Sequence, residues 1–444
     1  MPRSRRHVPL NVFLNSRLVG RLNRRSSGAI DFQYEPRWLD WEHALPVSLS
    51  LPLREDRYIG APVIAVFENL LPDSDGIRRR LAERVHAQGI DAYSLLAAIG
   101  RDCVGALQFL PDDLEPSPAG AVEGKPITEK EIADILGDLA SAPLGLSEDE
   151  AFRISIAGAQ EKTALLFWKR RWHKPLATTA TTHILKPQIG RLPNGIDLSF
   201  SVENEFLCLK LADALGLPSA SVAIERFGDK RVLVVERFDR RWTKDGRLLR
   251  LPQEDCCQAL SVPPTLKYES EGGPGIPAIL KLLRGSDEPD ADQTMFLKAV
   301  IAFWLLGATD GHAKNFSVHL SPGGRFRMTP LYDVISAQRS FDAGQIRRNK
   351  MKLAMAVGDN RHYAVADVLP RHFFQTAAKA GVGASVVRGA FEDIWAKGSA
   401  AVDHVVANLP KGFPAEVASS MIEGFRSRLR KLEETVLDRR GRFQ

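Results

Sequence analysis

The chain has few cysteines and no long apolar run. Its four cysteines, Cys103, Cys208, Cys256 and Cys257, lack the paired spacing of a zinc site, and adjacent cysteines form a disulfide poorly. We therefore expect reduced thiols, as in a cytosolic protein. The longest apolar run, over 299–306, is far too short to cross a bilayer, and the basic N-terminus precedes no cleavable leader. These absences predict a cytoplasmic protein with no membrane partner.

Length and charge bound the organisation of the chain. At 444 residues it is too long for one ordinary core, so two or three packed units are expected. Hydrophobic residues make up 44% and charged residues 26%, which is typical of a globular protein. The net charge of +6 permits contact with nucleic acid, but no aromatic residues interleave with the basic clusters over 78–80, 347–350 and 426–442. Direct DNA binding therefore stays a secondary hypothesis.

Hydrophobic periodicity separates a mixed α/β half from a helical half. Residues 11–14 and 17–22 alternate as strands around the turn residues Asn15 and Ser16, and helical stripes follow as far as Gly100. A stretch rich in Pro, Gly, Asp and Glu then predicts a linker. The predicted segments are an N-terminal accessory α/β subdomain over 1–112, the linker over 113–126, a mixed α/β segment over 127–250 and a mainly helical segment over 251–444.

The mixed α/β segment has its own strand and helix signals. Apolar strand patterns and one long helical stripe that stops at Gly216 follow each other in sequence. Gly228, Asp229 and Lys230 join the last two strands in a hairpin pattern. The predicted strands are 152–158 (FRISIAG), 162–168 (KTALLFW), 181–187 (TTHILKP), 221–227 (SVAIERF) and 231–238 (RVLVVERF), and the predicted helix is 199–216.

One loop in the helical segment holds residues with a chemical pattern. An apolar helix pattern ends at Gly307, which tolerates a left-handed cap, and the loop that follows contains Asp310 and Asn315. Asp333 lies eighteen residues beyond Asn315, after another strand pattern. Phosphoryl transfer needs one carboxylate to orient the acceptor hydroxyl, and a carboxamide and a second carboxylate to hold Mg²⁺ against the phosphates. Asp-x-x-x-x-Asn followed by a strand-end Asp is the spacing of a kinase catalytic loop.

This spacing is weak evidence when it stands alone. Asp and Asn in a loop are also ordinary turn residues, and His312 is most simply a hydrogen-bonded loop histidine without a second His nearby. Upstream features in the right order strengthen the hypothesis. They are a small-residue loop, a lysine strand, a helix and a strand that turns abruptly polar, all before the Asp/Asn loop.

Each upstream feature also has a plainer explanation. Lys186 lies in an apolar strand, where the α/β-phosphates of a nucleotide would balance its charge, yet lysines on edge strands are common. Gly158 stands in a small-residue loop ahead of Lys162, which suits close approach to phosphate oxygens. A single glycine matches neither Walker A nor G-x-G-x-x-G, so a plain hairpin also fits. Backbone groups over 236–238 are placed to hydrogen-bond the edge of an adenine, but the end of any buried strand offers such groups. Their joint order favours phosphotransfer.

The stretches around these residues resemble the HipA family of toxin–antitoxin kinases. The resemblance runs from about residue 45 to 356, and PRHFFQTA with a basic C-terminal helix extends it almost to the end. Long unbroken matches make it more specific than a kinase motif alone, and departures such as Cys256-Cys257 within LPQEDCCQ are conservative. The matching stretches are SLSLPL, ENLLPDS, IGRDCVGA, FRISIAGAQEKTALL, THILKPQIG, SVENE, VERFDRRW, LRLPQED, KYESEGGPGI, GATDGHAKNFSV, PLYDVISA and KLAM.

The resemblance implies an α+β, two-lobed protein-kinase-like fold, with the accessory subdomain and an upper lobe in the α/β half, an all-α C-terminal lobe, and ATP in the cleft. It implies a serine/threonine kinase that uses ATP and Mg²⁺, in which Asp310 is the catalytic base and Asn315 and Asp333 bind the metal. Ser155 would be the autophosphorylation site that switches the kinase off. The ATP contacts that it implies are Ala157, Gly158, Ala159, Gln160, Glu161, Lys162, Lys186, Glu236, Arg237, Phe238, His312, Lys314, Asn315, Tyr332 and Asp333.

The resemblance also implies partners that composition and spacing do not indicate. Family members pair with a helix-turn-helix antitoxin and reach operator DNA through it. They phosphorylate aminoacyl-tRNA synthetases, notably glutamyl-tRNA synthetase, which arrests growth and produces persistence. Two alternatives stay open, a small-molecule phosphotransferase and a non-catalytic subunit of a DNA-bound repressor complex. The presence of Lys186, Asp310, Asn315 and Asp333 together argues against the second, because a binding module does not need all four.

Overall fold

A computed structural model describes residues 9–146 and 152–437, which pack as two compact units. Unit 1 contains the N-terminal subdomain and most of the predicted upper lobe, and it continues past residue 250. Unit 2 contains most of the predicted helical segment together with the long helix before residue 216. Unit 1 comprises Met1–Pro187, Glu225–Thr265 and Val318–Phe326, and unit 2 comprises Gln188–Ile224, Leu266–Ser317 and Arg327–Gln444.

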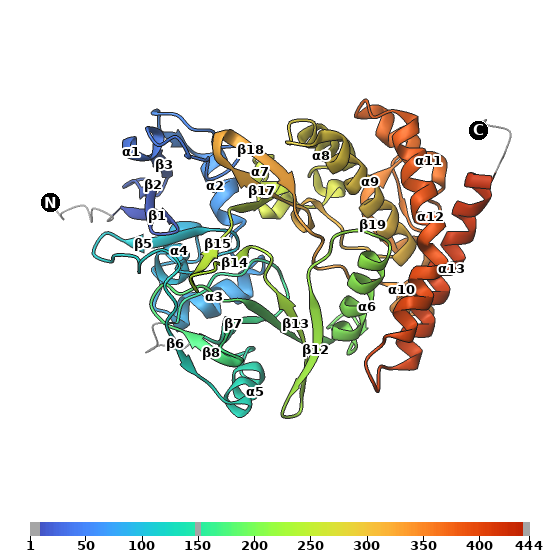
Figure 1. The fold of residues 1–444 in the computed structure, drawn as a ribbon, viewed down its shortest axis with the longest axis horizontal. Helices are drawn as coiled ribbons and strands as arrows, with labels where there is room; N and C mark the ends of the chain where they lie inside the picture. The colour runs from blue at the N-terminus through green and yellow to red at the C-terminus, as the bar shows by residue number, and fades with distance from the viewer. Residues whose placement is uncertain (1–8, 147–151, 438–444) are drawn as a thin grey trace. The chain divides into compact units, whose positions relative to one another are not determined.

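Unit 1 begins with a five-stranded antiparallel sheet in the order β4-β3-β2-β1-β5, of which Figure 1 labels β3, β2, β1 and β5. The first hairpin is as predicted, because Asn15 (φ 44°) and Ser16 (φ 68°) both have the positive φ that a two-residue hairpin turn requires. The strands are β1 (Leu10–Leu14), β2 (Arg17–Arg24), β3 (Ile30–Tyr34), β4 (Tyr58–Ile59) and β5 (Leu107–Pro111).

Four helices accompany this sheet. Ser74 and Asp91 cap two of them, since their side chains accept the backbone N–H groups of Ile77 and Ser94. Buried aromatic rings of Phe32, Phe67 and Phe109 join the sheet to the helix that carries Phe67. The helices are α1 (Pro36–Leu39), α2 (Ala61–Glu68), α3 (Asp75–Arg84) and α4 (Ala92–Ile99).

The second sheet of unit 1 has six strands in the order β12-β13-β9-β7-β8-β6. Helix α5 (Glu129–Gly137) starts with a capping box between Thr128 and Glu131 and packs Ile132 and Leu136 into the core of this sheet. The end of the predicted linker belongs to the sheet, because β6 pairs with β8. The strands are β6 (Gly124–Pro126), β7 (Thr163–Trp168), β8 (Arg171–Pro175), β9 (His183–Pro187), β12 (Val222–Phe227) and β13 (Lys230–Glu236).

The strand predicted over 152–158 is wrong, since residues 152–157 are irregular and Gly158 forms only an isolated bridge with Pro72. The backbone N–H of Ser155 donates to the carbonyl of Asp102 (2.9 Å) instead of joining a sheet. The smaller elements of unit 1 are β14 (Arg240–Trp242), β15 (Leu248–Arg250), β16 (Gln253–Asp255), α7 (Cys256–Ala259), β17 (Ser317–Ser321), β18 (Arg325–Met328) and the 3-10 turns η1 (Pro143–Gly145), η2 (Pro264–Leu266) and η5 (Pro322–Gly324).

Unit 2 is mainly helical and is organised around α9, which packs against α8, α12 and α13 (Figure 1). Twelve of the eighteen residues of α9 are buried, as expected for an apolar helix inside a core. No helix in the described ranges is long and apolar enough to cross a membrane. The helices are α6 (Ser201–Ala214), α8 (Ile276–Leu283), α9 (Pro289–Leu306), α10 (Gln338–Asp342), α11 (Pro370–Lys379), α12 (Ala384–Ala407) and α13 (Ala415–Leu437).

Two small hairpins complete unit 2. The hairpin of β19 with β20 has a register shift and lies close to the 3-10 turn η3. All four cysteines of the chain are buried and free of disulfides, in agreement with the expected reduced thiols. The remaining elements are β10 (Gly190–Arg191), β11 (Asp197–Leu198), β19 (Lys352–Val357), β20 (His362–Ala364) and the turns η3 (Glu269–Glu271), η4 (Ala313–Asn315) and η6 (Arg348–Lys350).

Candidate functional site

The loop that carries Asp310 starts at a well-defined helix end. Helix α9 ends at Gly307, whose left-handed conformation (φ 65°) is the predicted cap. The N–H of Ala308 returns to the carbonyl of Phe303 (2.8 Å) and closes the last turn. The loop then bends through two backbone hydrogen bonds, from His312 N–H to Asp310 O and from Asn315 N–H to His312 O, both 2.9 Å long. The sequence 310–315 is therefore a compact turn with Asp310 at its start and Asn315 at its end.

The structure brings Asn315 and Asp333 together, as their order in the chain predicts. The Nδ2 of Asn315 donates to the backbone carbonyl of Asp333 (3.1 Å). Asp333 has a positive φ of 56°, a conformation that costs free energy for a residue with a Cβ and that gathers at functional sites. Asn315 is buried, whereas the side chain of Asp310 is 53% exposed. Unit 2 thus holds the whole predicted Asp/Asn/Asp set.

Neighbouring side chains fix this turn. The hydroxyl of Tyr332 donates to the carbonyl of Lys314 (3.0 Å) and also contacts Ser317 Oγ. His312 is buried, and its Nε2 lies 3.7 Å from Oδ1 of Asp310. The framework of the Asp310–Asn315 turn therefore includes His312, Lys314 and Tyr332, the residues that the resemblance assigns to ATP.

Two residues that sequence reasoning did not assign complete the framework. Asn204 of α6 accepts the N–H of Ser336 (2.8 Å) and donates to the carbonyl of Ser336 (2.7 Å), so it holds the segment just after Asp333. Tyr268 donates its hydroxyl to Oδ1 of Asp310. Both lie in stretches, SVENE and KYESEGGPGI, that resemble the family, and this was the available signal. Neither spacing nor periodicity indicated the contacts.

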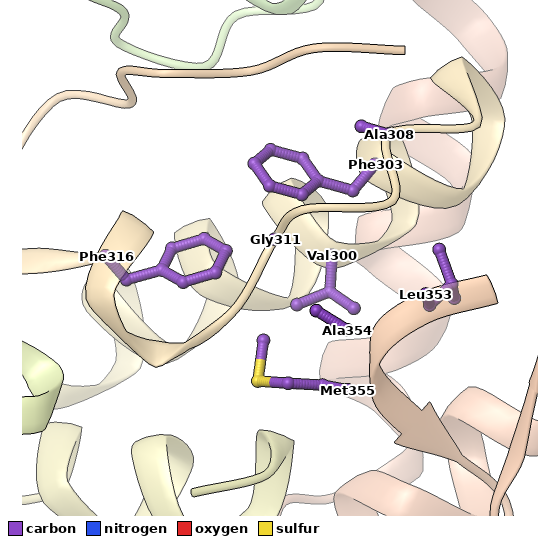
Figure 2. Close-up of a pocket in the computed structure, with 8 residues that line it drawn as sticks. All are labelled: Val300, Phe303, Ala308, Gly311, Phe316, Leu353, Ala354 and Met355. Atoms are coloured by element: carbon purple, nitrogen blue, oxygen red, sulfur yellow. The ribbon is translucent and has the colours of Figure 1, made fainter. Parts of the chain in front are cut away.

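An apolar gap lies directly behind the turn (Figure 2). It is lined by Val300 and Phe303 of α9, by Ala308, Gly311 and Phe316, and by Leu353, Ala354 and Met355 of β19. The gap is about the size of one water molecule. A Cβ on Gly311 would stand 2.2 Å from Cδ2 of Phe303, so only glycine allows the loop to lie this close to the helix.

In unit 1, the small-residue loop and Lys186 lie at the same edge of the six-stranded sheet. Thr163, which opens β7 directly after the loop, pairs with Leu185 of β9. The side chain of Gln160 donates to the carbonyl of Pro187 (3.0 Å), and Nζ of Lys162 donates to the carbonyl of Ala157 (2.6 Å). Ala159 lies within this turn. The predicted loop and the predicted lysine are therefore brought together.

The same loop is also tied to the N-terminal subdomain. Gly158, at a φ of 108°, bridges to Pro72, and its carbonyl accepts the N–H of Asp73 (3.2 Å). Glu161 forms an ion pair with Arg80 at 2.7 Å. Pro72 and Asp73 of the stretch ENLLPDS, together with Arg80, thus hold the loop in contact with the N-terminal subdomain.

The predicted hinge lies at the opposite end of β9 from Lys186. Glu236 pairs with His183, and three residues along a strand span about 10 Å. The N–H of Arg237 donates to the carbonyl of Thr182 (2.9 Å), so this donor is not available to an adenine edge. The ring of Phe238 packs edge to face on His319 at 5.8 Å. An adenine contact at Arg237 is therefore restricted to its carbonyl.

The side chain of Arg237 belongs to a buried ionic network instead. Asp102 forms ion pairs with Arg240 (2.8 Å), Arg250 (3.0 Å) and Arg237 (3.3 Å), and these four side chains are at most 5% exposed. Asp239 pairs with Arg237 and Arg240 and accepts the N–H of Gly105. Burial opposes ionisation of Asp102, but the charges of the three arginines outweigh it and hold its pKa below the ordinary value.

This network joins several stretches that resemble the family. IGRDCVGA supplies Asp102, VERFDRRW supplies Arg237, Asp239 and Arg240, and LRLPQED supplies Arg250. It therefore gives a structural role to the side chain of Arg237, which the resemblance assigned to the nucleotide. Together these charged residues join the N-terminal subdomain to the strands that carry Lys186.

Ser155 lies between the network and the loop. It is fully buried, and its Oγ donates to the carbonyl of Leu70 (2.8 Å). The preceding residues 147–151 lie outside the described ranges. The hydroxyl of the unmodified serine is therefore buried and already hydrogen-bonded in this conformation.

Comparisons with known proteins agree with this arrangement. The family described as HipA N-terminal domain matches residues 10–110, and the family described as HipA-like C-terminal domain matches residues 154–404. The chain is 39% identical over 384 residues to Y4mE of Sinorhizobium fredii, a protein predicted to be a kinase, covering 85% of this chain and 87% of that protein. It is 31% identical over 335 residues to the serine/threonine-protein kinase toxin HipA of Shewanella oneidensis, covering 72% of each chain.

A solved structure gives the same result for the fold. The chain matches a structure of the toxin–antitoxin system of Shewanella oneidensis, in which HipA is bound to HipB and its operator DNA. The TM-score is 0.79 at 25% identity, and the match covers 96% of this chain and 99% of that chain. Together with the Asp/Asn/Asp geometry, these matches show that the chain belongs to the HipA family of kinases.

Proposed function

We propose that the chain is a protein serine/threonine kinase that uses ATP and Mg²⁺, with Asp310 as the base that takes the proton of the acceptor hydroxyl. The observation that carries the proposal is the contact of Asn315 with Asp333 at the end of the turn that starts at Asp310. A carboxylate, a carboxamide and a second carboxylate in this order are the protein groups that phosphoryl transfer requires. Kinase relatives at 39% and 31% identity support the same chemistry.

The donor set fits Mg²⁺ that arrives with a nucleotide. In the described ranges, no three His, Cys, Asp or Glu side chains gather into a metal site, so a closed protein cage is not what holds the ion. Mg²⁺ is usually bound through one or two carboxylates plus substrate phosphates, and Asn315 with Asp333 supplies such an incomplete shell. When bound, Mg²⁺ would neutralise charge on the β- and γ-phosphates.

Unit 1 supplies the remaining groups that we assign to ATP. We assign the phosphates to the loop 157–162 and to Lys186, which share one edge of the sheet. We assign the adenine to the hinge 236–238, about three residues away along β9. His312, Lys314 and Tyr332 are the further contacts on unit 2, where their hydrogen bonds already fix the turn.

We also propose that Ser155 is an autophosphorylation site that switches the kinase off. A phosphate would add roughly −1.5 to −2 charge at pH 7. Because Ser155 is fully buried and bonded to the carbonyl of Leu70, the segment must leave its place for the phosphate to be accommodated. The adjacent loop 157–162 would then lose its shape. Calorimetry should show weak ATP binding for the phosphorylated form, and equal affinities before and after phosphatase treatment would remove this switch.

The biological proposal is a toxin of a toxin–antitoxin pair. The matched structure contains an antitoxin and operator DNA, which supports a helix-turn-helix antitoxin as the partner of this chain. We propose that operator DNA is reached mainly through the antitoxin, and that the acceptor is an aminoacyl-tRNA synthetase such as glutamyl-tRNA synthetase. The exposed cations Arg347, Arg348 and Lys350 favour only weak, salt-sensitive and sequence-indifferent contact of the chain alone with DNA.

One experiment tests the proposed function. The full chain is incubated with radiolabelled ATP and Mg²⁺, and transfer is compared between glutamyl-tRNA synthetase and a panel of sugars and aminoglycosides. Label on the protein acceptor, and its loss in Lys186→Ala with an unchanged melting temperature, would support the proposal. Label on a small molecule only would instead identify a small-molecule phosphotransferase.

A further inference from the structure

Tyr268 contacts Asp310, and the sequence pattern assigns no role to this tyrosine. Its hydroxyl donates to Oδ1 of Asp310, the proposed base. Its ring meets His312 edge to face, with ring centroids 4.9 Å apart and an interplanar angle of 89°. Because His312 is buried and its Nε2 lies 3.7 Å from the same carboxylate oxygen, Tyr268 and His312 together border Asp310.

The loop that carries Tyr268 is held in shape by contacts that do not involve Asp310. The carbonyl of Tyr268 accepts the N–H groups of Glu271 and Gly273, both at 3.0 Å. A Cβ on Gly273 would stand 1.9 Å from the carbonyl oxygen of Leu266, so the turn requires glycine there. The phenol is therefore presented by a tight turn with a defined backbone.

Glu269, the next residue, anchors this turn to the rest of unit 2. Its carboxylate accepts the N–H of Ala356 in β19 (2.6 Å) and pairs with Arg361 at 3.5 Å. A Cβ on Gly275 would stand 2.5 Å from the carboxyl carbon of Glu269, so glycine makes room for the carboxylate. Two glycines and one ion pair thus act together to place one tyrosine over Asp310.

We propose that Tyr268 is a positioning residue for phosphoryl transfer, which fixes the carboxylate of Asp310 in the orientation that receives the acceptor hydroxyl. This inference rests on the proposed function. Asp310 is 53% exposed, so its side chain would otherwise sample several rotamers in water. A hydrogen bond from a rigidly held phenol removes that freedom before the substrate arrives, and such preorganisation lowers the barrier of the chemical step.

The transfer step leaves Tyr268 chemically unchanged. The acceptor oxygen forms a bond to the γ-phosphorus, and the bond from that phosphorus to the β,γ-bridging oxygen breaks. The acceptor proton passes to the carboxylate of Asp310, and ADP leaves with the bond electrons. Tyr268 keeps its own proton and donates its hydrogen bond throughout, so it acts through Asp310 alone.

The test compares Tyr268→Phe with Tyr58→Phe in the full chain, using radiolabelled ATP and dephosphorylated casein as a generic acceptor. Tyr268→Phe keeps the ring against His312 and removes only the hydroxyl, so the melting temperature should not change. We expect kcat to fall roughly 10- to 100-fold while KM for ATP stays within about twofold, because misplacing the base harms only the chemical step. Tyr58 lies in β4 of unit 1, where its hydroxyl donates to the carbonyl of Pro52, so its variant loses the same group away from Asp310 and its kcat should match that of the parent.

Each other outcome overturns the inference in a recognisable way. An unchanged kcat in Tyr268→Phe would leave the hydroxyl without a positioning role. A raised kcat would show that the phenol blocks Asp310 as a gate. Asp310→Asn is measured alongside to separate the two levels of the account. If Asp310→Asn is inactive, an unchanged or a raised kcat in Tyr268→Phe overturns only the role of Tyr268. Parent-like activity in Asp310→Asn overturns the proposed function as well.

Discussion

Asp102 in unit 1 and Asp310 in unit 2 are the same residue type with opposite surroundings. Asp102 is 2% exposed and forms ion pairs with three arginines. Asp310 is 53% exposed, and its neighbours are the hydroxyl of Tyr268 and the ring of His312. A buried carboxylate held by three cations changes its charge only at high cost, so it serves stability. A carboxylate open to solvent can accept a proton during each turnover.

Resemblance to a family does not by itself separate a structural carboxylate from one that we propose as a catalytic base. Both aspartates lie in stretches that resemble the family, IGRDCVGA and GATDGHAKNFSV. Burial and the set of partners separate them, and both properties depend on tertiary contacts that local patterns do not contain, such as the bond from Arg240 to Asp102 across 138 positions.

The largest expected loss of stability follows from neutralising Asp102. Asp102→Asn removes the charge that compensates three buried arginines, so the free energy of unfolding should fall by about 3–5 kcal/mol. Denaturant unfolding monitored by circular dichroism measures this loss. Asp245→Asn is the matched control, because Asp245 pairs with Arg247 on the surface of the same unit and should change stability little. Equal stabilities of Asp102→Asn and the parent would mean that the network is not what holds unit 1 together.

The local structure was largely predictable from the sequence, and the long-range structure was not. The Asn15–Ser16 hairpin and the Gly307 cap follow from local turn chemistry, and both are confirmed. The strand over 152–158 was predicted from an apolar pattern, but Ser155 gives its N–H to Asp102 instead of a neighbouring strand. Local propensity does not include such a distant acceptor.

In the candidate site, too, the local features were predictable from the sequence and the long-range contacts were not. Spacing indicated Asp310, Asn315 and Asp333, because these residues occur in one short loop and at the end of one strand pattern. Tyr268 reaches Asp310 from forty-two residues away, and Asn204 reaches Ser336 across one hundred and thirty-two. Arg237 looked like part of a nucleotide-binding hinge, and only the structure shows its side chain paired with Asp102 and Asp239.

Another buried carboxylate in unit 1, that of Glu254, makes the stability of the protein dependent on pH. Glu254 accepts the N–H of Leu49 (2.7 Å), and burial, which disfavours the charged carboxylate, raises its pKa from 4.5 to about 8. Its contribution to stability is fully present below about pH 4.5 and is lost as the pH rises through about 8.

Glu254→Gln should therefore remove this dependence, because the amide stays neutral. The free energy of unfolding of the parent, relative to the variant, should fall by about 1.4 kcal/mol for each pH unit between these two values, to a total of several kcal/mol. Urea unfolding at pH 5, 7 and 9 measures the difference. Glu83→Gln makes the same chemical change at an exposed site of α3, and its curve should run parallel to that of the parent. Parallel curves for Glu254→Gln would contradict the assignment.

The smallest expected loss of stability comes from a substitution in the turn that carries Asp310. Gly311→Ala puts a Cβ 2.2 Å from the ring of Phe303, so the turn that follows Asp310 must shift. Stability should fall by about 1–3 kcal/mol, and kcat should fall by up to about 100-fold. Gly389→Ala is the control in the same unit, because no atom lies within 4 Å of its new Cβ, and alanine in α12 should stabilise by about 0.5–1 kcal/mol. A fully active Gly311→Ala would show that the turn tolerates displacement.

The central claim is that Asp310 is the base of a phosphotransferase, and single-turnover transfer from radiolabelled ATP tests it most directly. Asp310→Asn keeps the size of the side chain and removes its basicity, so the rate should fall about 100- to 10,000-fold while ATP still binds and the melting temperature is unchanged. Asp403→Asn, at an exposed position of α12 paired with Arg426, should transfer at the parent rate. Transfer by Asp310→Asn at the rate of the parent would contradict the account.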